Sequence, residues 1–359
     1  VTDAYGSIRT TGFTSGIANV NVNVIGTAAL TGSIASCPNS PVVLSIAFTG
    51  TAPFDIKLSD GTQKTFQASD LVAGVGTIVV TPNATTTYTI ASYIDNNGTG
   101  TSNGSATITI KTPVSITAQP VSASTICADG NVVLSVTAVG TNLTYQWYKN
   151  STAISGSTAS TYSAAAAGNY YVIVSGDCGS ATSIASSVLV NPLPQGSLDA
   201  NTICAGGVGQ LTFTSSTGVA PFTVVYNVGG VEYTATNVAS GVAFNTSVSP
   251  SATSTYTLVS VTDANGCSRV NSFTKASAAL TVNALPTIVT QATSQTVSAA
   301  ASTNFEVVAT GTNLTYQWQL SVDGGVSYVN MLNGTYYSGV NTSKLVVSNI
   351  ITKMNGFNY

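Results

Sequence analysis

The chain has 359 residues, of which 43% are hydrophobic and only 6% are charged, and its net charge is −3. Nine scattered Lys and Arg cannot form the basic patch that nucleic-acid binding requires, and no apolar run approaches the ~18 residues of a membrane-spanning helix. The length suits several domains of roughly 80–100 residues each. Because the chain begins Val1-Thr2-Asp3 without a signal peptide, we expect a mature protein or an excised segment.

Residues 1–30 have the pattern of strands that close a domain. Residues 1–7 (VTDAYGS) resemble residues 174–180 (VSGDCGS), a strand-turn passage much later in the chain. Residues 18–24 alternate between apolar residues and Asn, which is the period-2 pattern of a half-buried strand. We therefore expect residues 1–30 to be the C-terminal strands of a preceding domain.

Residues 31–113 and 194–285 carry the same landmarks in the same order. Each has an Ala-Pro-Phe step, then Thr-Tyr-Thr, then Asp-x-Asn-Gly. The offset is 168 residues both from Pro53 to Pro221 and from Tyr88 to Tyr256. A constant offset over several landmarks indicates internal duplication. The Asn-Gly steps are typical of tight turns between strands, so both units are predicted to be all-β.

The stretch at residues 140–147 (GTNLTYQW) recurs letter for letter at residues 311–318, and the two copies hold the only tryptophans, Trp147 and Trp318. Apolar and polar residues alternate in it, which predicts a half-buried strand with the tryptophan in the core.

Cysteines flank the first copy of this stretch. Trp147 lies about 20 residues after Cys127 and about 30 before Cys178, which is the spacing of an immunoglobulin-like (Ig-like) sandwich. Tyr170 follows Gly-Asn in the pattern of the tyrosine corner of that fold. We therefore predict that residues 114–193 form a complete Ig-like β-sandwich.

Residues 286–359 begin a second Ig-like unit and end at Tyr359, which matches the tyrosine-corner position. Residues 1–26 look like the strands that should follow. Either the native chain continues covalently, or separate subunits join head to tail by strand complementation. About three residues are missing at the junction by comparison with the complete unit (Tyr170 to Val174), which favours covalent continuation.

The five cysteines suggest disulfides in an oxidising, extracellular setting. We expect the bridges Cys127–Cys178 and Cys204–Cys267, each inside one unit. Cys37 matches Cys204 but Thr99 takes the place of its partner, so Cys37 is expected to be unpaired, either as a buried thiol or in an interchain bridge. Ser298 stands at the Cys127 position of the last unit. Zinc binding is disfavoured because there is no CxxC pair and no histidine.

No catalytic constellation, metal site or cofactor site is predicted. There is no histidine base, and the only glutamates, Glu232 and Glu306, lie in different units. Asp95 and Asp263 begin Asp-x-Asn-Gly turns that could offer oxygen ligands to calcium, but each turn has one carboxylate, so a turn role is favoured. An aromatic contact surface for sugars or proteins was weighed against scattered strand tyrosines, which are favoured. Its candidates are Tyr162, Tyr233, Tyr328, Tyr336 and Tyr337.

The phrases Asn-Leu-Thr-Tyr-Gln-Trp (142–147), Thr-Ser-Thr-Tyr-Thr (253–257) and Asp-Ala-Asn-Gly-Cys (263–267) resemble Ig-like and PKD-like repeats. Such repeats occur in very large surface proteins of Bacteroidetes, including gliding-motility-type adhesins and other cargo of the type IX secretion system. The resemblance implies that residues 31–113 and 194–285 are PKD-like sandwiches. It also implies a cell-surface or extracellular location and a structural or adhesive role.

The predicted architecture is a tandem of Ig-like and PKD-like β-sandwiches forming an extended rod or fibre. The function that fits it is a non-enzymatic surface fibre, stalk or filament, whose partners are neighbouring copies or adjacent repeats. Two alternatives stay open: a module that binds glycans or proteins, and an accessory region of a large secreted enzyme.

Overall fold

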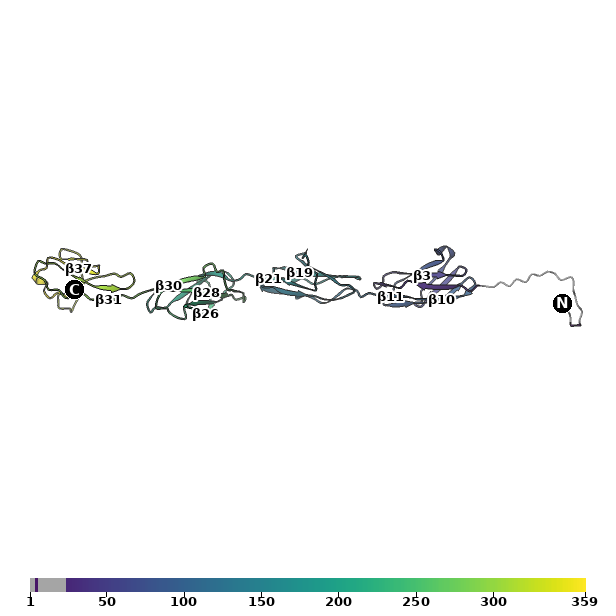
Figure 1. Ribbon diagram of the computed structural model, residues 1–359, viewed down its shortest axis with the longest axis horizontal. Coiled ribbons are helices and arrows are strands. Elements are labelled where there is room, and N and C mark those ends of the chain that lie inside the picture. Colours follow the sequence, from purple (N-terminus) through teal and green to yellow (C-terminus); the bar gives the residue numbers. More distant parts are fainter. Residues whose placement is uncertain (1–3, 6–23) are drawn as a thin grey trace. The chain divides into compact units, whose positions relative to one another are not determined.

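A computed structural model describes residues 4–5 and 24–359. The described part contains no α-helix, only strands and two short 3₁₀ segments at Ala68–Asp70 and Thr352–Met354 (Figure 1). The all-β prediction is confirmed. The chain divides into two compact units, residues 1–124 with 132–188, and residues 125–131 with 189–359.

The first sandwich lies in the first unit and has sheets of order β10-β1-β3-β6, β2-β11-β7 and β5-β4-β8-β9. Its strands are β1 (Thr27–Thr31), β2 (Ile34–Ser36), β3 (Val42–Phe48), β4 (Phe54–Leu58), β5 (Gln63–Phe66), β6 (Val75–Val80), β7 (Thr86–Tyr88), β8 (Ile90–Asp95), β9 (Gly98–Thr99), β10 (Thr101–Gly104) and β11 (Ala106–Ile110). Alternate residues of β3 are buried, because successive side chains of a strand point to opposite faces. Figure 1 marks β3, β10 and β11.

The boundary predicted at residue 30 needs correction. Strand β1 pairs with β3 and β10, and Ala28 and Leu30 are buried in the core of the first sandwich. Residues 27–30 therefore open this sandwich. The sequence pattern alone does not show which sheet these residues join. Residues 1–3 and 6–23, where the rest of that prediction falls, lie outside the described residues.

The second sandwich holds Trp147 and Tyr170, both fully buried. Its strands are β12 (Ser115–Ala118), β13 (Ala123–Cys127), β14 (Val132–Ser135), β15 (Thr137–Val139), β16 (Thr144–Lys149), β17 (Thr152–Ala153), β18 (Thr161–Ala164), β19 (Gly168–Gly176), β20 (Gly179–Thr182) and β21 (Ser186–Asn191). Its largest sheet has the order β13-β21-β19-β16-β17. The Tyr170 hydroxyl donates to the Ala166 carbonyl at 2.7 Å, as in a tyrosine corner.

The third sandwich lies in the second unit and repeats the plan of the first. Its strands are β22 (Gln195–Ala200), β23 (Thr202–Cys204), β24 (Gln210–Thr217), β25 (Phe222–Val228), β26 (Val231–Val238), β27 (Ala243–Asn245), β28 (Ser254–Thr262), β29 (Ser268–Arg269) and β30 (Ser277–Asn283). In both copies a short early strand pairs in parallel with the last strand, β2 with β11 and β23 with β30. The common pairing supports the predicted duplication.

The fourth sandwich has a smaller core than the others. Its strands are β31 (Thr287–Thr290), β32 (Thr303–Glu306), β33 (Val308–Thr310), β34 (Gln319–Leu320), β35 (Val329–Asn330), β36 (Tyr337–Ser338) and β37 (Lys344–Val347). They form sheets of only two or three strands. The buried core consists of Trp318, Met331, Val340, Leu345 and Val347.

Candidate functional site

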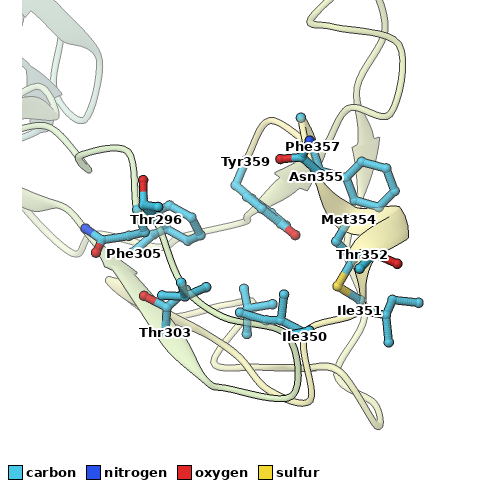
Figure 2. A pocket seen from close by; sticks show the side chains of 15 residues that line it. Thr296, Thr303, Phe305, Ile350, Ile351, Thr352, Met354, Asn355, Phe357 and Tyr359 are labelled. Carbon is cyan, nitrogen blue, oxygen red and sulfur yellow. The ribbon is translucent and has the colours of Figure 1, made fainter.

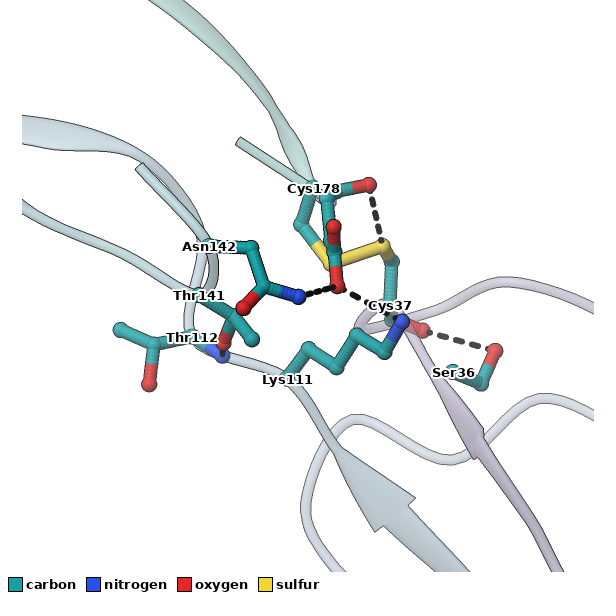
Figure 3. Close-up of a disulfide and its surroundings, with 8 residues drawn as sticks. Ser36, Cys37, Lys111, Thr112, Thr141, Asn142 and Cys178 are labelled. Atoms are coloured by element: carbon teal, nitrogen blue, oxygen red, sulfur yellow. Dashed lines mark hydrogen bonds and ion pairs between the residues drawn. A yellow bond between two sulfur atoms is a disulfide. The ribbon is translucent and has the colours of Figure 1, made fainter. Parts of the chain in front are cut away.

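Two disulfides connect neighbouring sandwiches. Cys37, directly after β2 of the first sandwich, is bonded to Cys178 in the turn between β19 and β20 of the second (Figure 3). Cys127, at the end of β13 of the second sandwich, is bonded to Cys267 in the turn between β28 and β29 of the third. Each bridge spans 5.5 Å between Cα atoms, which lies in the range of ordinary disulfides.

The expected pairing, Cys127 with Cys178 and Cys204 with Cys267, is therefore wrong, and so is the expectation that Cys37 is unpaired. Strand β14 begins just after Cys127, at the end of the sandwich that faces the following domain. Strand β19 ends just before Cys178, beside Thr144 at the start of β16, at the opposite end. The two cysteines thus lie at opposite ends of one sandwich and cannot form the B–F bridge that their spacing suggested.

The two bridges follow one rule. An early cysteine of one sandwich pairs with a cysteine in a late turn of the sandwich that follows. The sequence separations, 141 and 140 residues, are almost equal. That near-equality was visible in the sequence and is the signal that would have predicted the pairing.

Cys204 is exposed and free. It ends β23, the strand that corresponds to β2, so it occupies the place that Cys37 has in the first sandwich. If Cys204 followed the pairing of the other two bridges, its partner would lie in a late turn of the fourth sandwich.

Hydrogen bonds and an ion pair surround the first bridge (Figure 3). Lys111 Nζ lies 2.8 Å from Asp177 Oδ2, and Asn142 Nδ2 donates to the same oxygen at 2.9 Å. The Lys111 ammonium, and then the Asn142 amide, lower the pKa of Asp177. Beside them, the Thr112 amide donates to Thr141 Oγ1 at 2.9 Å, and the Thr141 amide donates back to the Thr112 carbonyl at 3.1 Å.

The junction of the third and fourth sandwiches repeats part of this arrangement. The Ala284 amide donates to Thr312 Oγ1 at 2.9 Å, and the Thr312 amide donates to the Ala284 carbonyl at 3.2 Å. Asn313 adopts the left-handed backbone of its counterpart Asn142, with φ values of 51° and 55°. No counterpart of Asp177 or Cys178 is present in the described residues of the fourth sandwich.

The two tryptophan motifs have the same internal bonds. Trp147 Nε1 donates to the Ala159 carbonyl and Trp318 Nε1 to the Thr342 carbonyl, both at 2.9 Å. Gln146 and Gln317 each donate to the carbonyl of the following tryptophan and to one further carbonyl across the sheet. The identical sequence therefore builds the same local structure twice.

The surroundings of the two motifs differ. Strand β16 pairs with β17 on one side and along its whole length with β19 on the other. In the fourth sandwich one hydrogen bond of this pairing is present. The Ser321 amide donates to the Asn358 carbonyl, as the Asn150 amide donates to the Asn169 carbonyl in the second sandwich. No strand continues beyond that bridge in the described residues.

Two cavities lie in the fourth sandwich, and both are lined by Tyr359. One of about 450 Å³ lies against residues 314–319 and Tyr359, on the face that β19 covers in the second sandwich. The other, of about 440 Å³, lies between residues 295–299, Phe305 and Tyr359 (Figure 2). Residues 295–299 correspond to β13, which pairs with the last strand β21 in the second sandwich. The cavity beside Trp318 is mainly apolar, whereas the one beside Phe305 has a mixed polar and apolar lining.

The residues considered for other chemistry have structural roles. Asp263 Oδ1 accepts from the Asn265 and Cys267 amides and Oδ2 from the Val219 amide. Asp95 likewise accepts from the Asn97 and Thr51 amides, so both carboxylates hold turns. The described residues contain no group of three or more Cys, Asp or Glu that could hold a metal.

Two of the five tyrosines considered for an aromatic surface pack in cores. Tyr162 packs between the rings of Trp147 and Tyr170 at centroid distances of 5.9 and 5.6 Å. Tyr233 stacks on the buried Tyr226. Tyr328 and Tyr336 of the fourth sandwich are 47% and 37% exposed.

Comparisons with known proteins found one family model and several solved structures that are similar to this chain. A family model described as "Ig-like domain CHU_C associated" matches residues 113–192. An I-band fragment from titin is 15% identical, covers 73% of this chain and 99% of its own, and has a TM-score of 0.44. Immunoglobulin domains 1–5 of Sidekick-1 are 16% identical, cover 90% and 72%, and have a TM-score of 0.31. Domains 3–5 of Drosophila OTK are 14% identical, cover 67% and 91%, and have a TM-score of 0.26. No curated protein matches the chain significantly.

Proposed function

We propose that this chain is a non-enzymatic structural region of an extracellular fibre, stalk or adhesin, built to carry tension. The observation that carries the proposal is that both disulfides join neighbouring sandwiches. A bridge inside a sandwich would stabilise that sandwich alone. A bridge between sandwiches limits their relative motion and preserves the covalent connection when one sandwich opens or a linker is cut.

The disulfides support an extracellular location. Disulfides form and persist in oxidising compartments. In the part of the chain that the structure describes, no helix is long and apolar enough to cross a membrane. The Ig-like family match and the resemblance of the repeats to those of giant Bacteroidetes surface proteins support placement on such a cell surface, delivered by type IX secretion. Its partners would be adjacent repeats or further copies, head to tail.

The two bridges are interleaved, and this makes a mechanical test possible. In the oxidised chain the shortest covalent path runs from residue 1 to 37, back from 178 to 127, and on from 267 to 359. At roughly 3.3–3.6 Å per extended residue, that path is about half of the full chain.

We therefore expect the oxidised chain, held by its ends in a force spectrometer, to extend to about half the length of the reduced chain. The Cys127→Ser variant should reach an intermediate length, and Cys204→Ser should behave like the parent. If oxidised and reduced chains extend equally, the bridges do not carry tension and the proposal is wrong.

A further inference from the structure

Strand β26 forms a free edge of the third sandwich (Figure 1). The main sheet of this sandwich has the order β23-β30-β28-β25-β26. Strand β26 pairs with β25 on one side, and the described residues place no strand on its other side. An edge strand presents a row of unpaired N–H and C=O groups to which a further strand can be added. The sheet of the third sandwich can therefore be extended at β26.

The hairpin that joins β25 to β26 determines which main-chain groups point to this edge. Its loop consists of two glycines with φ values of 60° and 86°, and Val228 lies opposite Val231. In a hairpin with a two-residue loop the flanking pair is hydrogen-bonded, and hydrogen-bonded and non-hydrogen-bonded pairs alternate from there. Every second residue from Val231 onward therefore bonds to β25, whereas the N–H and C=O groups of Glu232 and Thr234 point to the free edge.

The corresponding strand of the first sandwich, β5, is protected against such pairing. It has only four residues, and one of them is Lys64. The Lys64 ammonium lies 4.6 Å from the centroid of the Phe66 ring and donates to the Thr77 carbonyl at 2.8 Å. Short length and lysine are two of the means by which proteins keep sheet edges from pairing. Strand β26 has eight residues, no Lys, Arg or Pro, and a single charged residue, Glu232, so this protection is absent from it.

We propose that β26 pairs with β26 of a second copy of the chain, antiparallel and about a twofold axis at Tyr233. Tyr233 is the middle residue of the regular part of the strand, which ends at Ala235, where the register with β25 shifts. In this arrangement Glu232 lies opposite Thr234 of the second copy, and the edge-facing N–H and C=O groups of both residues find partners. The pairing goes beyond the function proposed above, because it joins chains side by side.

The side chains of β26 are complementary to themselves in this register. Tyr233 meets Tyr233 of the second copy at a non-hydrogen-bonded position, where side chains lie closest and aromatic pairs stabilise a sheet. The ring of Tyr233 already stacks on the buried Tyr226 at a centroid distance of 5.9 Å, so the pairing extends an existing row of aromatic rings. Each Glu232 carboxylate lies opposite a threonine, so no like charges meet directly. A nearly uncharged strand that fits itself favours a second copy as the occupant.

The first experiment places a cysteine on the proposed axis of the 359-residue chain. It uses the Cys204→Ser background, so that the exposed free cysteine cannot form links of its own. Adding Tyr233→Cys should give one covalent dimer on a non-reducing gel, because Cα atoms about 4.5 Å apart lie within the range of disulfides. The control Thr257→Cys, on the exposed face of the central strand β28, should stay monomeric. A Tyr233→Cys chain that stays monomeric, or that links no better than the control, overturns the proposal.

A second experiment tests the register through charge at the exposed Thr234. Thr234→Lys should tighten association about fivefold in analytical ultracentrifugation, because each lysine then lies opposite Glu232 of the other copy. Thr234→Glu should weaken it by a similar factor, because two carboxylates then lie opposite each other. The same two substitutions at Thr257 should leave association unchanged.

The sign of the two effects decides the outcome. If lysine and glutamate at position 234 change association in the same direction, or not at all, the twofold pairing at Tyr233 is wrong. An extended segment of a different protein as the natural occupant of the edge would give that result, since it does not place Glu232 of one copy opposite Thr234 of another. Neither experiment involves the disulfides inside one chain, so the force measurement can succeed where this proposal fails.

Discussion

At the residue scale, the hydroxyl groups of buried tyrosines form hydrogen bonds to the backbone within each of the first three sandwiches. Tyr93 is 1% exposed, and its hydroxyl donates to the Thr49 carbonyl at 2.7 Å. Tyr256 and Tyr170 are equally buried and also donate to backbone carbonyls. Burial, and then the neighbouring Asp95 carboxylate, raise the pKa of Tyr93 from 10.0 to about 12. The ionised phenolate is therefore far less stable in the folded protein than in the unfolded chain.

This shift predicts how the first sandwich responds to alkali. A pKa that is raised on folding contributes stability that is fully present below pH 10 and is lost as the pH rises through about 12. We expect the first sandwich to lose stability across this window, as measured by hydrogen exchange of its strands. In Tyr93→Phe the loss should be smaller, and the difference in ultraviolet absorption between the two proteins should titrate near pH 12. A midpoint near 10 would show that Tyr93 is exposed to solvent.

At the element scale, the same strand sequence behaves differently in two sandwiches. Residues 144–149 form a six-residue strand, whereas residues 315–320 are paired only at Gln319–Leu320. Local sequence places the tryptophan and its hydrogen bonds in both. A regular strand, however, requires neighbours on the sheet, and the fourth sandwich offers a neighbour on one side only.

The two tryptophans should therefore report different environments. Trp318→Phe leaves Trp147 as the only tryptophan, and Trp147→Phe leaves Trp318, so each emission can be measured alone. We expect Trp318 to be quenched more strongly by acrylamide, because it borders a cavity of about 450 Å³ and is 8% exposed, whereas Trp147 is 0% exposed. Equal quenching would show that the face beside Trp318 is covered.

At the scale of the whole molecule, the disulfides turn a series of sandwiches into linked pairs. The loops that they close, 141 and 140 residues apart in sequence, overlap between Cys127 and Cys178. The first three sandwiches are thereby connected both by the main chain and by sulfur. Opening of one sandwich then leaves its neighbours tethered.

The pairing predicts the outcome of thiol chemistry on the native chain. Alkylation without reduction should modify one cysteine, Cys204, and none in the Cys204→Ser variant. After reduction, all five cysteines should react. Mass spectrometry of an unreduced digest should find peptides of Cys37 joined to Cys178 and of Cys127 joined to Cys267. A peptide joining Cys127 to Cys178 would contradict the structure.

Much of the fold could be read from local patterns. Alternation predicted the strands, the 168-residue offset predicted the duplicated sandwiches, and the tyrosine-corner pattern located Tyr170. These features depend on residues close in sequence or on repetition, and both are visible in a single chain. The start of the first sandwich was misplaced because a local strand pattern does not show which sheet a strand joins.

The sequence by itself determined the all-β class, the repeats, the first tryptophan strand and the absence of histidine from the chain. The second copy, residues 311–318, was also predicted to be a strand but is not one. The tertiary structure decided how the cysteines pair, because a disulfide depends on the end of the sandwich at which each sulfur lies, and strand direction sets that end. It also located the two cavities of the fourth sandwich, because their linings come from strands that lie far apart in the sequence. The spacing of Cys127 and Cys178 by itself contains neither piece of information; only the near-equal separations of 141 and 140 residues point to the pairing.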